Sequence, residues 1–253
     1  MDKQTWRTYV EKYKGAFVVW VDQSTDPLLK ANNSRGVCFA MSIDFVTAYQ
    51  AGQPGPFDFV NGIRDTTNRW PNTSRIPPKY LDIQAASQAM LDDYLLNLEL
   101  LQLELEIAEK DEKPALITNI KQFMDDRIKQ RYGPGMATYE KFKEDSLFAA
   151  GELFDRMKAT VTQNGNSYFL VEMRREKGPG GHAIAFGFRQ DLSGSDKFPA
   201  IYEYFDANLG YFVFPSVDKL LDFFSLKVWL EVYSKKSYSN FAIASYTAKK
   251  GKR

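Results

Sequence analysis

The sequence predicts a single α+β domain, with a mainly helical part over about residues 1–160 and a sheet over about 161–253. Two patterns predict this fold class. Segments with apolar residues every three or four positions fill the first part, as in amphipathic helices. Short aromatic and β-branched runs separated by turn residues fill the second, as in strands joined by tight turns. Helices followed by successive strands indicate a helical layer packed on an antiparallel sheet.

The first strongly predicted helix covers residues 38–50 and begins at the chain's only cysteine, Cys38. Apolar side chains occupy most of its circumference, so most of this helix should be buried. Gly52 and Pro54 end it. Residues 52–80 are rich in Gly, Pro, Asn and Thr and predict a long loop.

Three more helices are predicted over residues 82–110, 115–131 and 139–159. In the first of them, leucines recur every three or four positions between strong helix formers. Partial alternation over residues 98–107 also permits a strand, but the Leu, Glu and Gln composition favours a helix. The Gly-Pro-Gly turn at residues 133–135 separates the other two helices.

Strands and turns dominate the rest of the chain. Ser216 predicts the N-cap of a helix over about 217–227. The basic tail, residues 249–253, should fray. The predicted strands cover residues 167–174, 183–189, 200–205, 211–214 and 241–246.

The composition excludes several classes of function. Lys and Arg number 33 and Asp and Glu 32, so a net charge of +1 gives no reason to expect nucleic acid or a membrane surface as partner. No apolar run approaches the ~20 residues of a membrane span, and the N-terminus lacks a signal-peptide pattern, so we expect a soluble chain. One cysteine and one histidine exclude an intramolecular disulfide and zinc sites that need two thiolates or two histidines. We expect no cofactor and no metal.

Cys38 is a candidate nucleophile because it opens its helix. The free N–H groups at a helix N-terminus favour an anion, which lowers the pKa of a thiol and favours the nucleophilic thiolate. Gly36 permits the tight backbone that such a turn often requires. The alternative is that Cys38 is a small buried hydrophobe on an apolar helix.

His182 and Asp206 are the candidate partners of Cys38. His182 opens one predicted strand and Asp206 closes the next, so the aspartate can accept the Nδ1–H of the histidine and orient its ring. Taken singly, each residue has a simpler interpretation: His182 as an exposed turn residue and Asp206 as part of an Asx-turn. Together they are more specific, because the histidine follows the cysteine by 144 residues, within the roughly 130–150 typical of papain-like enzymes.

Three short segments resemble the YopT/AvrPphB family of bacterial type III effector cysteine proteases, which belongs to the papain-like clan. They are residues 36–41 (Gly-Val-Cys-Phe-Ala-Met), 181–185 (Gly-His-Ala-Ile-Ala) and 205–212 (Phe-Asp-Ala-Asn-Leu-Gly-Tyr-Phe). The family carries a Cys-His-Asp triad in this order and usually shows Asp-Pro-Asn-x-Gly-x-Phe in the last segment. This chain departs from that pattern at Ala207, where Pro is common. Residues 55–160 lie outside the resemblance.

The resemblance implies a papain-like fold whose helical lobe carries the nucleophile Cys38, with His182 and Asp206 completing the triad. It also implies that the side-chain amide of Asn33, five residues before the cysteine, stabilises the oxyanion together with the Cys38 N–H. The alternative is that Asn32 and Asn33 only form a turn. The family's activity implies a protein that a bacterium delivers into a host cell, where it cleaves a host protein such as a small GTPase or a kinase.

Two other functions remain open from the sequence. The same triad fits glutamine deamidation or acyl transfer, because all of these reactions pass through a thioester. A non-catalytic binding module, with the long helices as its surface, is the other alternative.

Overall fold

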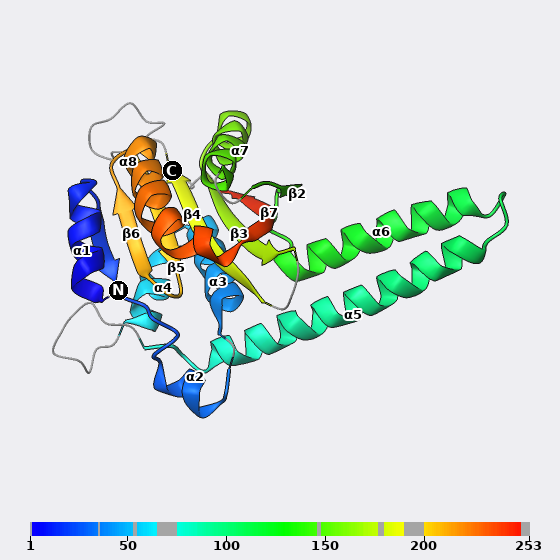
Figure 1. Cartoon of the computed structure of the whole chain (residues 1–253), viewed down its shortest axis with the longest axis horizontal. Coiled ribbons are helices and arrows are strands. Elements are labelled where there is room, and N and C mark those ends of the chain that lie inside the picture. Colours follow the sequence, from blue (N-terminus) through cyan, green and yellow to red (C-terminus); the bar gives the residue numbers. More distant parts are fainter. Residues whose placement is uncertain are drawn as a thin grey trace.

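The computed structural model describes residues 2–34, 36–52, 55–64, 75–145, 148–176, 180–189 and 200–248. Within these ranges, an antiparallel sheet lies between two helical layers, and a long helical hairpin projects from one end (Figure 1). The α+β class predicted from the sequence is confirmed. No helix among the described residues combines the length and apolar character that a bilayer span requires.

All five predicted strands form, and they lie next to one another in the sheet. The order across the sheet is β1-β6-β5-β4-β3-β7-β2, and every neighbouring pair is antiparallel. The five predicted strands are β3 (Ser167–Arg175), β4 (Gly181–Arg189), β5 (Ile201–Asp206), β6 (Gly210–Phe214) and β7 (Tyr238–Thr247).

The two edge strands come from the part of the chain that was predicted to be helical. They are β1 (Ala16–Val19) and β2 (Thr138–Lys143). The predicted helix over 139–159 is therefore wrong at its start, and the helix there, α7, covers Ala149–Asn164. Residues 138–143 are exposed or half-buried throughout, which suits a strand at the edge of a sheet. The predicted division of the chain into a helical part before about residue 161 and a sheet part after it is correct for the five central strands but not for the edge strands β1 and β2.

Helices cover both faces of the sheet, so the central strands are buried on both sides. On β3, Phe169 and Val171 pack toward one helical layer, and Tyr168 and Leu170 pack toward the other. This two-sided burial explains why the strands read as continuous apolar runs rather than as alternating patterns. One layer contains α1 (Lys3–Lys12), α7, α8 (Val217–Phe223) and a π-helix (Phe224–Tyr233); the other contains α3 (Cys38–Ala51), α4 (Gly55–Ile63) and the inner ends of α5 (Lys79–Ile107) and α6 (Lys113–Tyr132).

The predicted helices over 38–50, 82–110 and 115–131 are confirmed as α3, α5 and α6, and the strand alternative over 98–107 is excluded. The predicted loop over 52–80 is wrong in part, because α4 occupies residues 55–63. Its Gly-Pro-Phe-Asp-Phe start carries loop-forming residues that mask an amphipathic turn. Pro54, residues 65–74 and the tail 249–253 lie outside the described residues.

The C-terminal helix begins as predicted and continues beyond the predicted end. The Ser216 hydroxyl accepts from the Lys219 N–H and caps α8. The chain then continues as the π-helix and a 3₁₀ turn (Ser234–Lys236) instead of stopping near residue 227. The sequence also gave no strong signal for α1 or for the short α2 (Pro27–Ala31).

The hairpin of α5 and α6, residues 79–132, is called the arm below. Its two helices are joined by the stacked rings of Tyr94 and Phe123, whose centroids lie 5.8 Å apart, and by an Arg127–Asp93 ion pair of 2.8 Å. Only the inner ends, at Tyr80, Ser87 and Tyr132, are fully buried. The rest of the arm extends away from the body (Figure 1).

Candidate active site

Cys38 occupies the first position of α3, as predicted. Val37 is the N-cap and offers no side-chain hydrogen bond. The side-chain oxygen of Gln84 on the arm accepts from the Ala40 N–H at 3.2 Å. The helix packs on β4, where the Ser42 hydroxyl donates to the Ala183 carbonyl at 3.2 Å. These contacts fix the end of α3 that carries the thiol against the strand that carries His182.

The turn before Cys38 needs a glycine and is held by Gln23. Gly36 has a φ of +122°, and a Cβ there would lie 2.8 Å from the Gln23 Oε1. That oxygen accepts from the Val37 N–H at 2.7 Å. The same side chain donates through Nε2 to the Asn208 Oδ1 at 2.8 Å. Gln23 therefore joins the cysteine turn to the loop that follows Asp206.

His182 and Asp206 lie on the adjacent strands β4 and β5 and contact one another directly. The His182 Nε2 lies 2.9 Å from the Asp206 Oδ1. The nitrogen predicted for this contact was Nδ1, so that detail is wrong. The ring is turned so that Nε2 faces the carboxylate, and the His182 ring also interacts electrostatically with the Cys38 thiol.

Asp206 is fully buried and its carboxylate is saturated with donors. The Tyr204 hydroxyl donates to Oδ2 at 2.7 Å, and the Tyr233 hydroxyl donates to the same oxygen. The Asn208 N–H donates to Oδ1 at 2.8 Å. Burial alone would raise the pKa of Asp206, but His182 and these donors outweigh it and hold the pKa below its usual value. Asp206 is therefore a stable carboxylate at neutral pH.

The thiol and the imidazole shift one another's pKa in opposite directions. Burial alone would raise the pKa of Cys38, but the neighbouring His182 and the Ala183 N–H outweigh it and lower the pKa. Burial alone would lower the pKa of His182, but Asp206 and Cys38 outweigh it and raise the pKa to about 10. At a pH between the lowered pKa of Cys38 and the raised pKa of His182, the pair exists as a thiolate and an imidazolium, which is the reactive form of a cysteine nucleophile.

A cavity of about 440 Å³ opens onto Cys38 and His182. Asn33 lines it, is exposed, and has a φ of +48°. Its side-chain amide makes no hydrogen bond to any described residue, so it is available to a bound group. Gln23, Asn208 and Lys236 also line the cavity.

Several residues of this site carried no signal in the sequence. Gln23 lies in a turn-rich segment far from Cys38 along the chain, and only the folded structure brings the two together. Asn208 lies 3.3 Å from the His182 Nε2 through its Nδ2, whereas the sequence indicated only a turn. Tyr233 lies on the π-helix and its hydroxyl donates to Asp206. The ring of Tyr233 is tilted against that of His182, and the two ring centroids lie 5.2 Å apart.

The described residues contain no group of three or more His, Cys, Asp or Glu side chains arranged to hold a metal ion.

Several solved structures are similar to this chain, including the following two. The cysteine protease-like domain of the Photorhabdus asymbiotica toxin PaTox is similar over 96% of this chain and 57% of its own, with 12% sequence identity and a TM-score of 0.46. The Pseudomonas avirulence protein AvrPphB is similar over 90% of this chain and 95% of its own, with 16% identity and a TM-score of 0.39. This chain thus spans less than two thirds of the PaTox chain.

No family model matches the sequence. No curated protein matches it either. Neither of these two similarities assigns a role to any residue of this chain.

Proposed function

We propose that this chain is a papain-like cysteine protease with a Cys38–His182–Asp206 triad. One observation carries the proposal: the chain's only thiol opens a helix and shares a cavity with an imidazole whose Nε2 contacts a buried carboxylate. A structural cysteine needs none of these partners. An activated thiol nucleophile requires a neighbouring base and a third group that orients the base, and His182 and Asp206 are placed for these two roles.

In the first half of the reaction, the Cys38 thiolate attacks the carbonyl carbon of a peptide bond. A C–S bond forms and the carbonyl electrons move to oxygen, giving a tetrahedral oxyanion. The Cys38 N–H and the side-chain amide of Asn33 stabilise this oxyanion. As the C–N bond breaks, the His182 imidazolium gives its proton to the leaving amine, and a thioester remains on Cys38.

In the second half, the now neutral His182 takes a proton from a water molecule, which attacks the thioester carbonyl. The C–S bond breaks, the acid product leaves and the thiolate–imidazolium pair returns. Asp206 keeps the ring oriented and stabilises the imidazolium in both halves. Gln23 acts as a positioning residue, because it holds the turn before Cys38 and touches no reacting atom.

The substrate that we propose is a protein of a host cell, into which a bacterium delivers this chain. A small GTPase or a kinase is the kind of target that the family resemblance suggests. The cavity beside Cys38 is open rather than enclosed by the described residues, which suits an extended segment of a larger protein.

Intact-mass comparison of host-lysate proteins tests this function. Lysate incubated with the wild type should contain a protein split into two fragments whose masses sum to the parent plus one water. Lysate incubated with Cys38→Ala should contain the uncut parent. An increase of about one dalton in an uncut protein would replace protease by deamidase, and an acyl-sized increase would replace it by acyltransferase. No difference between the two lysates would contradict all three.

A further inference from the structure

The outer face of the arm carries a row of apolar side chains with no partner among the described residues. Leu96, Leu100, Leu103 and Ile107, called the leucine stripe here, are between 52% and 85% exposed. Their spacings of four, three and four residues place them along one side of α5. This is the a/d spacing by which two helices pack along a seam.

The leucine stripe is separate from the side of α5 that packs on α6. From residue 91 onward, the half-buried apolar residues of α5 recur with the same kind of spacing, at 91, 94, 98, 101 and 105. Because an apolar side chain on a lone surface helix gains nothing from exposure, a second regular apolar row on the opposite side marks an interaction surface. The half-buried row that packs on α6 would be enough to hold a hairpin of two helices together.

The residues that flank the leucine stripe are acidic. Asp92, Glu99 and Glu106 recur at seven-residue intervals along one edge, and Glu104 lies on the other. After Lys79, α5 contains no Lys or Arg at all. Glu99, Glu104 and Glu106 form no ion pair with any described residue, whereas Asp93, nearer the base, is paired with Arg127.

We propose that the arm is a docking surface for a basic amphipathic helix of a partner protein. Such a helix would bury its own apolar row against the leucine stripe and place Lys or Arg beside the unpaired glutamates. A second copy of this chain is disfavoured, because stripe-to-stripe packing would set one acidic α5 against another. An anionic membrane surface is disfavoured for the same reason.

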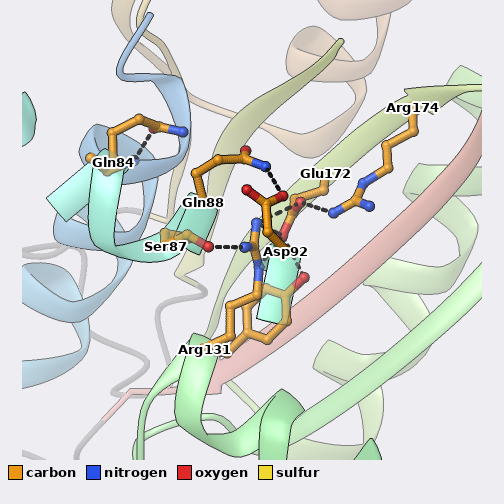
Figure 2. Close-up of polar contacts among 9 residues, drawn as sticks. Gln84, Ser87, Gln88, Asp92, Arg131, Glu172 and Arg174 are labelled. Carbon is orange, nitrogen blue, oxygen red and sulfur yellow. Dashed lines mark hydrogen bonds and ion pairs between the residues drawn. The ribbon is translucent and has the colours of Figure 1, made fainter. Parts of the chain in front are cut away.

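The base of the arm is fixed, so a docked partner would be held at a defined place relative to the body. Arg131 on α6 pairs with Glu172 on β3 at 3.0 Å and donates to the Ser87 carbonyl at 2.9 Å, and Figure 2 shows Arg174 reaching the same carboxylate. The Arg131 guanidinium also lies 4.2 Å from the ring centre of Phe39, the residue after Cys38. The docking itself does not depend on catalysis by Cys38.

The test uses the full chain carrying Cys38→Ala, so that the probe is not consumed. The probes are two labelled synthetic peptides of about four heptads, both with Leu at a and d, one with Lys and the other with Glu at e and g. Fluorescence anisotropy should show at least roughly tenfold tighter binding of the Lys peptide, and this preference should shrink as salt is raised.

Matched variants locate the binding. Leu100→Glu should weaken the Lys peptide at least roughly tenfold, whereas Leu226→Glu, which changes an exposed leucine of the π-helix, should leave it unchanged. Glu99→Gln with Glu106→Gln should weaken the Lys peptide and not the Glu peptide. Circular dichroism melting curves that overlay the parent's confirm that each variant is folded.

Three results would overturn the proposal. The first is equal binding of the two peptides, or equal effects of Leu100→Glu and Leu226→Glu. The second is a concentration-dependent dimer in sedimentation that Leu100→Glu abolishes, which would make a second copy the occupant. The third is binding to phosphatidylcholine vesicles that Leu100→Glu abolishes, which would make the stripe a lipid contact.

Discussion

Asp206→Asn removes one negative charge from the buried end of the proposed triad while it keeps the size of the side chain. Asp206 accepts from His182 and the Asn208 N–H on one oxygen and from the Tyr204 and Tyr233 hydroxyls on the other. An asparagine has one acceptor oxygen and one NH₂ group, so its NH₂ must face a pair of donors in either orientation. The His182 imidazolium then loses its counter-charge, and one donor pair loses its acceptor.

The size of the effect follows from the bond that is lost. A hydrogen bond to a charged group contributes about 1.5–3 kcal/mol, and each 1.4 kcal/mol is about tenfold in an equilibrium constant. The thiolate–imidazolium pair should therefore become roughly 10- to 150-fold less populated relative to the neutral pair. Because the raised pKa of His182 and the lowered pKa of Cys38 depend on each other, the Cys38 pKa should move up toward the ordinary thiol value of 9.0.

The assay is the rate of Cys38 alkylation by iodoacetamide as a function of pH, read by mass spectrometry. The chain has one cysteine, so the adduct reports this site alone. In the wild type the rate should fall only when the pH drops through the lowered Cys38 pKa, because the thiolate is then protonated. In Asp206→Asn the same fall should begin at higher pH, and the rate at neutral pH should be lower by at most roughly 150-fold.

The matched control is Asp125→Asn, which changes an exposed aspartate on α6. Its alkylation profile should overlay that of the wild type. A wild-type profile in Asp206→Asn would refute the reasoning, because it would mean that the buried carboxylate does not support the charged pair.

Three further predictions follow from the same contacts. Asn33→Ala should lower kcat/KM on the cleaved substrate roughly 10²–10³-fold if its amide binds the oxyanion, and an unchanged kcat/KM would remove Asn33 from the site. A Cys38→Ala/His182→Ala double variant should lose little more activity than either single variant because the two act as a unit, and multiplicative losses would show independent roles. Glu172→Gln should lower the free energy of unfolding in urea by about 3–5 kcal/mol, since it leaves the buried Arg131 guanidinium without its charge partner; a loss under 1 kcal/mol would show that the base of the arm does not depend on this pair.

The central strands and long helices could be predicted because local patterns and tertiary burial agree there. α3, α5 and α6 have uninterrupted helical spacing, and β3 to β6 have apolar runs bounded by turn residues. β2 was mistaken for the start of a helix because its charged residues fit a solvated helix face as well as an exposed strand edge. Only its pairing with β7 decides between the two, and that pairing joins segments about a hundred residues apart.

The site was predictable in part for a related reason. Cys38 and His182 stood out because each is the only residue of its type in the chain, and Asp206 because it closes the strand after His182. Gln23 and Tyr233 could not be predicted, because common residue types in turn-rich or apolar segments give no local signal of a contact made across the fold. The choice of Nε2 over Nδ1 depends on the ring rotamer, which the sequence does not determine.

The central claim is that His182 lowers the pKa of Cys38, so that the thiol ionises as a thiolate–imidazolium pair. It is tested most directly by the ultraviolet absorbance of the thiolate, measured as the difference between the wild type and Cys38→Ala across the pH range. The difference isolates this one thiol, since the tyrosines contribute equally to both proteins. The thiolate signal should appear with a midpoint below the ordinary thiol pKa of 9.0, because His182 lowers the pKa of Cys38. A midpoint at or above 9.0 would contradict this claim and leave Cys38 an ordinary thiol without activation.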